Sequence, residues 1–76
     1  MLKQAVKRGH NGRPGWKLYF EYDLDTIEAL KKAIPHTDRA WDEEHKYWWV
    51  AIEHQDTLLR LFPQLEAYLH QMEMPL

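Results

Sequence analysis

The stretch that decides the fold is RAWDEEHKYWWV, residues 39–50, which places three of the four tryptophans of the chain around a short acidic segment. Aromatic and β-branched residues favour strands, whereas the three successive acids at 42–44 are too polar for a core. The pattern therefore predicts a β-hairpin with an acidic turn. A buried aromatic ring contributes about 1.5 to 3 kcal/mol, and we expect Trp41 and Trp48 to share a face and lie in the core.

The second arm of this hairpin alternates between two faces. One face carries Trp48, Val50 and Ile52, and the other carries Tyr47, Trp49 and Ala51. Residues 16–22 alternate in the same way and predict an earlier strand. We expect Leu18, Phe20 and Tyr22 on its core side and Lys17, Tyr19 and Glu21 on its outer side.

The segment before that strand predicts a short first strand over residues 2–7. Residues 9–15 are rich in glycine and include an Asn-Gly pair, so they predict either a hairpin turn or a flexible arm.

Two helical segments complete the pattern. The first begins at Asp23 or Asp25, which both suit an N-cap, and ends before Pro35. Apolar residues at helical spacing predict a second helix over residues 55–71, which Pro63 either kinks or divides in two.

The order of these elements is (β)βαββα. We expect an α+β fold in which a small antiparallel sheet of three to four strands carries two or three helices on one face. The 76 residues leave room for one domain, with a basic arm or first strand at 1–15, a core at 16–71 and a frayed tail at 72–76. The open face of the sheet then carries Tyr19, Tyr47 and Trp49, with Lys17 nearby.

The composition excludes several classes of protein. Hydrophobic residues make up 45% of the chain, which excludes intrinsic disorder. The chain contains no cysteine and no serine, so disulfides, thiolate metal sites and the usual serine and cysteine nucleophiles are excluded. Because no apolar run has the length of a signal peptide or a membrane span, we expect a soluble, cytoplasmic protein.

The histidines show no metal-binding spacing, neither His-x-His nor His-Glu-x-x-His. They are His10, His36, His45, His54 and His70. An acidic turn exposed to water also gives no reason for a perturbed catalytic carboxylate. We therefore expect no metal, no cofactor and no catalytic residue, and we predict that the protein is not an enzyme.

The charge is uneven along the chain, although the net charge is only −2. All twelve acids lie after residue 20, whereas the first 17 residues hold five basic residues and no acid. These are Lys3, Lys7, Arg8, Arg13 and Lys17. Such a cluster favours contact with phosphates, although a solvated terminus would carry the same charges.

Several residues of the core resemble the HARP domain and its short bacterial and phage relatives. The matching positions are Tyr22-Asp23, Ile27, Leu30-Lys31, Ile34-Pro35, Arg39, Trp41-Asp42, Lys46, Trp48 and Val50. The likeness spans about residues 16–62 and extends to the basic first strand. The chain departs from the family at Glu43 and Ala51, where proline is common, at Trp49, where a small polar residue is usual, and at 36–38, where the family has a glycine-containing turn.

The resemblance implies a DNA-binding accessory module. HARP domains accompany SNF2-type ATPases that reanneal DNA strands, and they are associated with branched DNA and with junctions between single and double strands. No motor is encoded in these 76 residues. The resemblance therefore implies a recognition part that acts alone or beside a separately encoded helicase or ATPase.

The open sheet face supplies the candidate base contacts. A base can stack on Tyr19, Tyr47 or Trp49, and such stacking is worth about 1 to 3 kcal/mol per base. Arg39 and Lys46 are candidate phosphate contacts, and the five basic residues near the N-terminus complete the predicted site. Simpler alternatives exist, because aromatic rings also pack across strands and basic side chains also cover tryptophans.

A protein-interaction module is the competing function. An acidic body repels DNA unless the basic arm folds over the sheet. The aromatic face would then join two copies of the chain in a weak homodimer, or dock a different partner.

Overall fold

The computed structural model describes residues 2–73, and for residues 70–73 it describes only the backbone. Four antiparallel strands form one sheet, in the order β1–β2–β4–β3. The strands are β1 (Leu2–Lys7), β2 (Gly15–Phe20), β3 (Arg39–Asp42) and β4 (Tyr47–Ala51). The hairpin predicted from residues 39–50 is the β3–β4 pair, in which Trp41 lies opposite Trp48. β2 and β4 occupy the centre of the sheet, and β1 and β3 form its edges.

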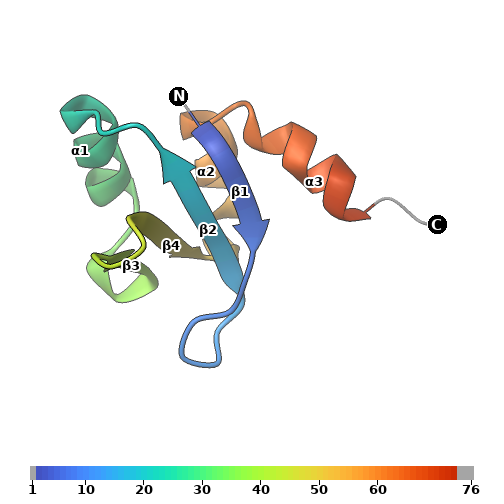
Figure 1. Ribbon diagram of the computed structural model, residues 1–76, viewed down its shortest axis with the longest axis horizontal. Helices are drawn as coiled ribbons and strands as arrows, with labels where there is room; N and C mark the ends of the chain where they lie inside the picture. Colours follow the sequence, from blue (N-terminus) through green and yellow to red (C-terminus); the bar gives the residue numbers. More distant parts are fainter. Residues whose placement is uncertain (1, 74–76) are drawn as a thin grey trace.

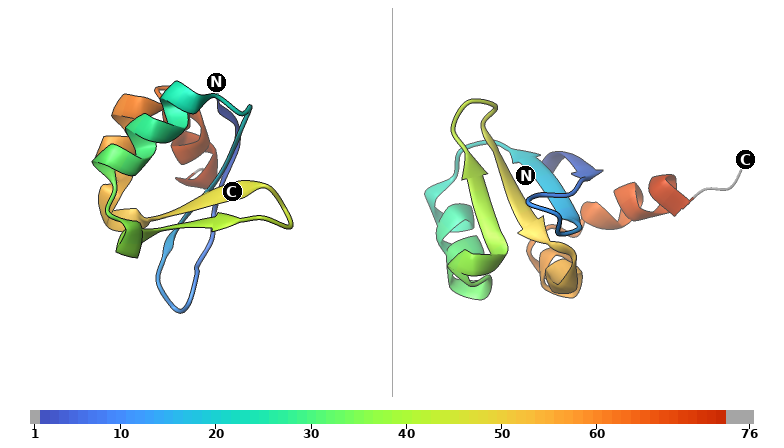
Figure 2. Two further views of the ribbon diagram at one scale, coloured as in Figure 1. Left: turned by 90° about the vertical axis from the view of Figure 1, so that its left-hand side faces the viewer. Right: turned by 90° about the horizontal axis from the view of Figure 1, so that it is seen from below.

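The helices of the described chain are α1 (Leu24–Ala33), α2 (Gln55–Leu61) and α3 (Leu65–Glu73), with short 3₁₀ turns η1 (His36–Asp38) and η2 (Ile52–His54). They lie together on one side of the sheet (Figure 1, Figure 2). This arrangement confirms the predicted α+β fold, with the first strand present and the last helical run divided in two. Among the described residues, no helix has both the length and the apolarity that crossing a bilayer requires.

The core lies between the sheet and the helices. Trp16 and Leu18 of β2 are fully buried and lie opposite Val50 and Trp48 of β4. The indole Nε1 of Trp16 donates to Oε1 of Gln55 at 2.9 Å, so this large buried side chain keeps its polar group satisfied. The helices contribute the buried residues Leu30, Ile34, Leu58, Phe62 and Leu65.

The first helix begins and ends at the expected signals. The side chain of Asp23 accepts a hydrogen bond from the backbone N–H of Asp25 at 3.0 Å, so Asp23 is the N-cap. Pro35 disfavours the helical conformation for the residue before it, and Ile34 accordingly has an extended backbone, with φ −117° and ψ 122°.

The proline at position 63 divides the C-terminal helical run, one of the two outcomes predicted for it. Phe62, which precedes it, has φ −131° and ψ 83°, outside the helical region. The chain therefore turns between α2 and α3, and both helices reach the core.

The last helix is tied to the first strand. The hydroxyl of Tyr68 donates to the carbonyl oxygen of Lys3 at 2.9 Å. α3 extends to Glu73, so the first part of the predicted frayed tail, 72–76, is helical, and the remainder, 74–76, lies outside the described residues.

The β1–β2 connection is a hairpin turn, which settles the choice between a turn and a flexible arm. Asn11 and Gly12 have φ values of 52° and 78°, the left-handed values that a type I′ turn requires. His10 and Arg13 flank the turn and exchange backbone hydrogen bonds of 2.8 and 3.0 Å. The basic residues of this region therefore lie on an ordered hairpin.

Two aromatic residues expected in the core are exposed. Trp41 shares a face with Trp48, with 5.3 Å between ring centroids, but it is 44% exposed because β3 is the last strand of the sheet. Tyr22 is 80% exposed because β2 ends at Phe20, so the strand alternation does not extend to it. The predicted core positions of Trp41 and Tyr22 are wrong, whereas that of Trp48 is confirmed.

Candidate nucleic-acid interface

Three of the predicted site residues form a cluster on the sheet face that the helices leave uncovered. Lys17 and Tyr19 belong to β2 and Tyr47 belongs to β4. The Nζ atom of Lys17 lies 4.4 Å from the ring centroid of Tyr47 and 5.7 Å from that of Tyr19. The two rings are 5.5 Å apart, and all three side chains are half-buried. We call Lys17, Tyr19 and Tyr47 the open-face cluster.

The β3–β4 turn holds Tyr47 in place. Burial raises the pKa of the Tyr47 phenol, and a hydrogen bond with Asp42 raises it further, so the phenol stays neutral. The backbone N–H of His45 donates to Asp42 Oδ1 at 2.8 Å and lowers the pKa of that carboxyl. The ring of His45 also stacks on Tyr47, with 6.3 Å between centroids. The Tyr47 ring is therefore positioned before any ligand binds.

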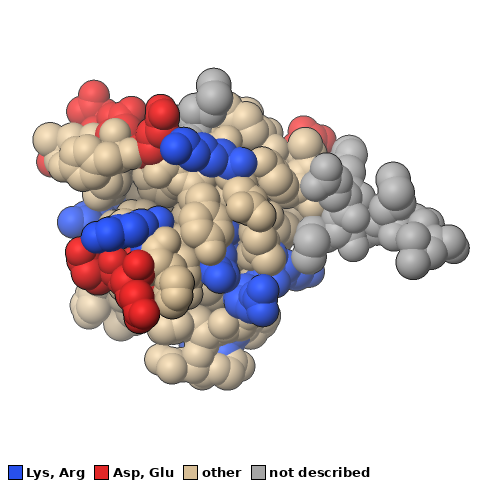
Figure 3. All heavy atoms as spheres, in the orientation of Figure 1, with Lys and Arg blue, Asp and Glu red and all other residues tan. Residues whose placement is uncertain are grey.

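The exposed basic residues of the β1–β2 hairpin point to different surfaces. The backbone N–H of Arg8 donates to Gly15, which extends the ladder and places Arg8 on the open face. In the register of β1 and β2, Lys7 lies opposite the buried Trp16, so its side chain projects on the helix side of the edge strand. Lys3 lies where the register of β1 shifts, between Leu2 and Gln4. Lys and Arg side chains gather over β1 and β2, whereas acids gather at the β3–β4 turn and near the start of α1 (Figure 3).

The remaining arginine of this hairpin, Arg13, is already paired with acids. Its Nη2 atom lies 2.9 Å from Asp38 Oδ1 and 3.5 Å from Glu53 Oε1, and its Nη1 atom donates to the carbonyl oxygen of Thr37 at 2.8 Å. These bonds fasten the hairpin to η1. The predicted role of Arg13 as a phosphate contact conflicts with this pairing, because the acids already neutralise its charge.

The predicted stacking residue Trp49 is buried, with 2% of its surface exposed. Its Nε1 atom donates to the carbonyl oxygen of Arg8 at 2.9 Å, the ring of His10 lies 5.0 Å away, and the guanidinium of Arg13 lies 5.7 Å away. Gly15 provides the space, since a Cβ atom there would lie 2.5 Å from ring atoms of Trp49. Trp49 does face the open side, but the hairpin covers it, so in this arrangement its ring is not accessible to a base.

Two other predicted phosphate contacts, Arg39 and Lys46, lie apart from the open-face cluster. Arg39 donates from Nε to the carbonyl oxygen of Ile34 at 2.9 Å, and its guanidinium lies 5.9 Å from the ring of Trp48 on the helix side. Lys46 donates from Nζ to Glu43 at 2.7 Å. The position of Arg39 matches the simpler alternative, in which its side chain covers a tryptophan.

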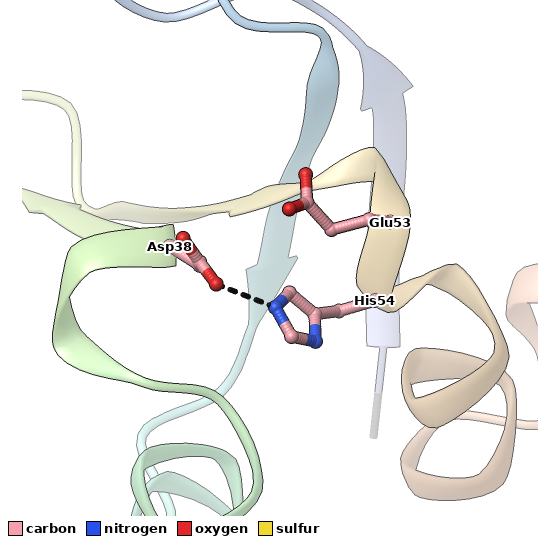
Figure 4. Close-up of side chains that lie close together, drawn as sticks. All are labelled: Asp38, Glu53 and His54. Atoms are coloured by element: carbon pink, nitrogen blue, oxygen red, sulfur yellow. Dashed lines mark hydrogen bonds and ion pairs between the residues drawn. The ribbon is translucent and has the colours of Figure 1, made fainter.

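The fold also brings together a polar cluster that the spacing of the histidines in the sequence did not predict. Asp38 of η1 and Glu53 and His54 of η2 bring one potential metal-ligand atom each within 4.8 Å of the others. Asp38 Oδ2 lies 2.8 Å from His54 Nε2 (Figure 4). Local spacing could not reveal the cluster, because Asp38 and His54 are 16 positions apart.

The donor types of this cluster, two carboxylates and an imidazole, suit a divalent cation such as zinc. The guanidinium of Arg13, however, already bonds Asp38 and approaches Glu53, so a cation there would have to displace it. Hydrogen bonds from His54 and Arg13 lower the pKa of Asp38. The described contacts are those of an ion-pair network that joins the β1–β2 hairpin, η1 and η2.

Comparisons with known proteins give no match to a family model, a curated protein or a solved structure. The likeness to the HARP domain therefore stays a prediction from the residues that carry it.

Proposed function

We propose that the chain is a non-catalytic module that binds single-stranded or forked DNA through the sheet face opposite the helices. The observation that carries this proposal is the open-face cluster, in which the ammonium of Lys17 lies beside the rings of Tyr19 and Tyr47. A tyrosine ring can stack on any unpaired base, and an ammonium beside it attracts the adjoining phosphate. Arg8, on the same face, adds a further positive charge.

The chemistry of the cluster favours unpaired bases over duplex DNA. A ring on a sheet surface can stack only on a base whose own face is free, as in a single strand or at the branch of a fork. The acids at the β3–β4 turn repel phosphates, so the strand would leave the cluster along β1 and β2, where the basic side chains gather (Figure 3).

The resemblance to the HARP domain supports a narrower version of the proposal. In this version the DNA is a fork or a junction, and the module acts in the cytoplasm beside a separately encoded ATPase that remodels or repairs DNA. Affinity for a forked oligonucleotide above that for either a single strand or a duplex would support it, and equal affinities would remove it.

Fluorescence anisotropy with a labelled single-stranded oligonucleotide tests the central claim. Tyr47→Ala should weaken binding about tenfold, because it removes a stacking surface, whereas Tyr47→Phe keeps the ring and should bind like the wild type. Lys17→Ala should also weaken binding, while Lys32→Ala, which removes an exposed charge from the last turn of α1, should not. Equal effects of the two lysine variants would mean that the DNA affinity depends only on the net charge of the protein and not on the position of Lys17.

A homodimer through the open face remains the second candidate. It is favoured by the partial exposure of Tyr19 and Tyr47 and disfavoured by the burial of Trp49, which removes the largest ring from the surface. Sedimentation of the wild type over a range of concentrations separates the two candidates. A dimer that Tyr47→Ala dissociates would replace the DNA proposal.

A further inference from the structure

The large hydrophobic side chains that remain exposed in the described chain line one groove between α1 and β3. They are Tyr22, Leu24 and Trp41, which are 80%, 55% and 44% exposed. The groove has a volume of about 500 Å³, and Ile27 and Trp48 also line it. Single exposed hydrophobic residues are ordinary, but several on one surface mark a binding site.

One side of this groove is a free sheet edge. In the described sheet, β3 pairs with β4 alone. Every second residue of an antiparallel strand directs its backbone N–H and C=O groups away from its partner, so the outer edge of β3 carries unpaired groups. An extended peptide can pair with such an edge as an added strand.

The charged side chains of the groove are both positive. Lys31 and Arg39 line it, and no acidic side chain does so. Their charged groups lie 6.0 and 5.9 Å from the ring of Trp48, and no carboxylate of the described chain forms an ion pair with either. A ligand that carries carboxylates would therefore complement this groove.

We propose that this groove binds an extended peptide segment of a partner protein, in which apolar side chains alternate with acidic ones, and that the segment pairs with the edge of β3. The apolar side chains would cover Tyr22, Leu24 and Trp41. The carboxylates would meet Lys31 and Arg39, and the backbone would satisfy the free edge.

The surroundings of the groove favour a peptide over a nucleic acid. The indole Nε1 of Trp41 donates to Glu43 at 2.8 Å, which holds a carboxylate at the turn end of the groove. Asp23 and Asp25 lie at the start of α1, beside Leu24. A nucleic acid carries a negative charge at every nucleotide and would meet these acids, whereas a peptide can confine its carboxylates to the two cations.

The groove is separate from the open-face cluster. Trp41 and Trp48 lie on the helix side of the sheet, and the cluster lies on the other side. DNA and a partner peptide could then bind at the same time. The inference goes beyond the proposed function and does not depend on it.

Selection from a display library of short random peptides against the immobilised wild type tests this inference. We expect enriched peptides that alternate apolar and acidic residues. Lys31→Glu should weaken their binding about tenfold or more, since it reverses a charge in the groove, whereas Lys32→Glu makes the same change at the neighbouring exposed residue and should have no effect. Leu24→Ala and Trp41→Ala should each weaken peptide binding, and Leu24→Ala should leave the affinity for single-stranded DNA unchanged.

Several results would overturn the inference. They are the absence of any enriched peptide, enrichment of basic peptides, and equal affinity of the enriched peptides for the Lys31→Glu and Lys32→Glu variants. A loss of DNA affinity in Leu24→Ala would assign the groove to nucleic acid, and a wild-type dimer that Trp41→Ala dissociates would assign it to a second copy of the chain. Circular dichroism establishes whether each variant is folded. If Trp41→Ala is unfolded, the comparison of Lys31→Glu with Lys32→Glu decides whether the groove binds the peptide.

Discussion

The indole Nε1 of Trp49 donates a hydrogen bond to the carbonyl oxygen of Arg8 at 2.9 Å, joining residues 41 positions apart. This bond holds the β1–β2 hairpin over the central strand β4. It makes Trp49 a packing residue and leaves Lys17, Tyr19 and Tyr47 as the aromatic and basic surface of the open face. The hairpin thus covers one tryptophan and also carries half of the Lys and Arg residues of the chain.

The space beneath the hairpin depends on a glycine, which gives the first prediction. Gly15→Ala should lower the free energy of unfolding by about 2 to 3 kcal/mol, because the new Cβ atom would meet the ring of Trp49 at 2.5 Å and the carbonyl oxygen of Val50. Gly9→Ala is the control, since a Cβ atom there would lie 3.4 Å from its nearest neighbour. Urea denaturation measures both, and equal stability of the two variants would contradict the packing described here.

The second prediction compares the two tryptophans of the β3–β4 hairpin. Trp48→Ala should cost about 3 to 5 kcal/mol of stability, the range for emptying a buried aromatic site, which is a large fraction of the stability of so small a domain. Trp41→Ala should cost only about 1 to 2 kcal/mol, because 44% of this side chain is exposed in the folded state. Thermal melts distinguish the two, and a larger loss for Trp41→Ala would mean that β3 is covered in solution.

The third prediction concerns the salt dependence of DNA binding. Replacing Arg8 with alanine should flatten the slope of log affinity against log salt concentration by up to about 0.9, without changing which DNA structure is preferred, because Arg8 lies on the open face. Lys7→Ala should leave the slope nearly unchanged, because Lys7 projects on the helix side. Arg13→Ala should leave that slope unchanged and lower the stability instead, because Asp38 and Glu53 already pair with this arginine. A slope that changes for Arg13→Ala and not for Arg8→Ala would reverse these roles.

The fourth prediction concerns pH. Hydrogen bonds from His54 and Arg13 hold the pKa of Asp38 below its ordinary value of 3.8 in the folded chain. The unfolded chain therefore binds this proton first as the pH falls, so the ionised Asp38 stabilises the fold above about pH 3.8 and this stabilisation is lost below it. The stability difference between the wild type and Asp38→Asn, measured by urea denaturation, should be present at pH 7 and should shrink as the pH falls below about 3.8. A difference that stays constant down to pH 2 would show that Asp38 contributes no charge interaction.

Local patterns in the sequence predicted the elements and most of their faces. Alternation assigned Trp48 and Val50 to the core side and Tyr47 to the open side, because successive side chains of a strand must point in opposite directions. Asp23 and Pro63 marked a helix start and a helix break through bonds and clashes that involve only their neighbours. The α+β fold followed from the order of these elements.

Only the tertiary structure decided what covers each face. Trp49 is buried because a hairpin 41 positions away folds over it, and Trp41 is exposed because β3 has no further strand beside it. In the same way, the charge of Arg13 is paired with that of Asp38, which lies 25 positions further along the chain. Periodicity describes the direction of a side chain relative to its own strand, whereas burial and ion pairing depend on segments that are distant in sequence, and these meet only when the whole chain has folded.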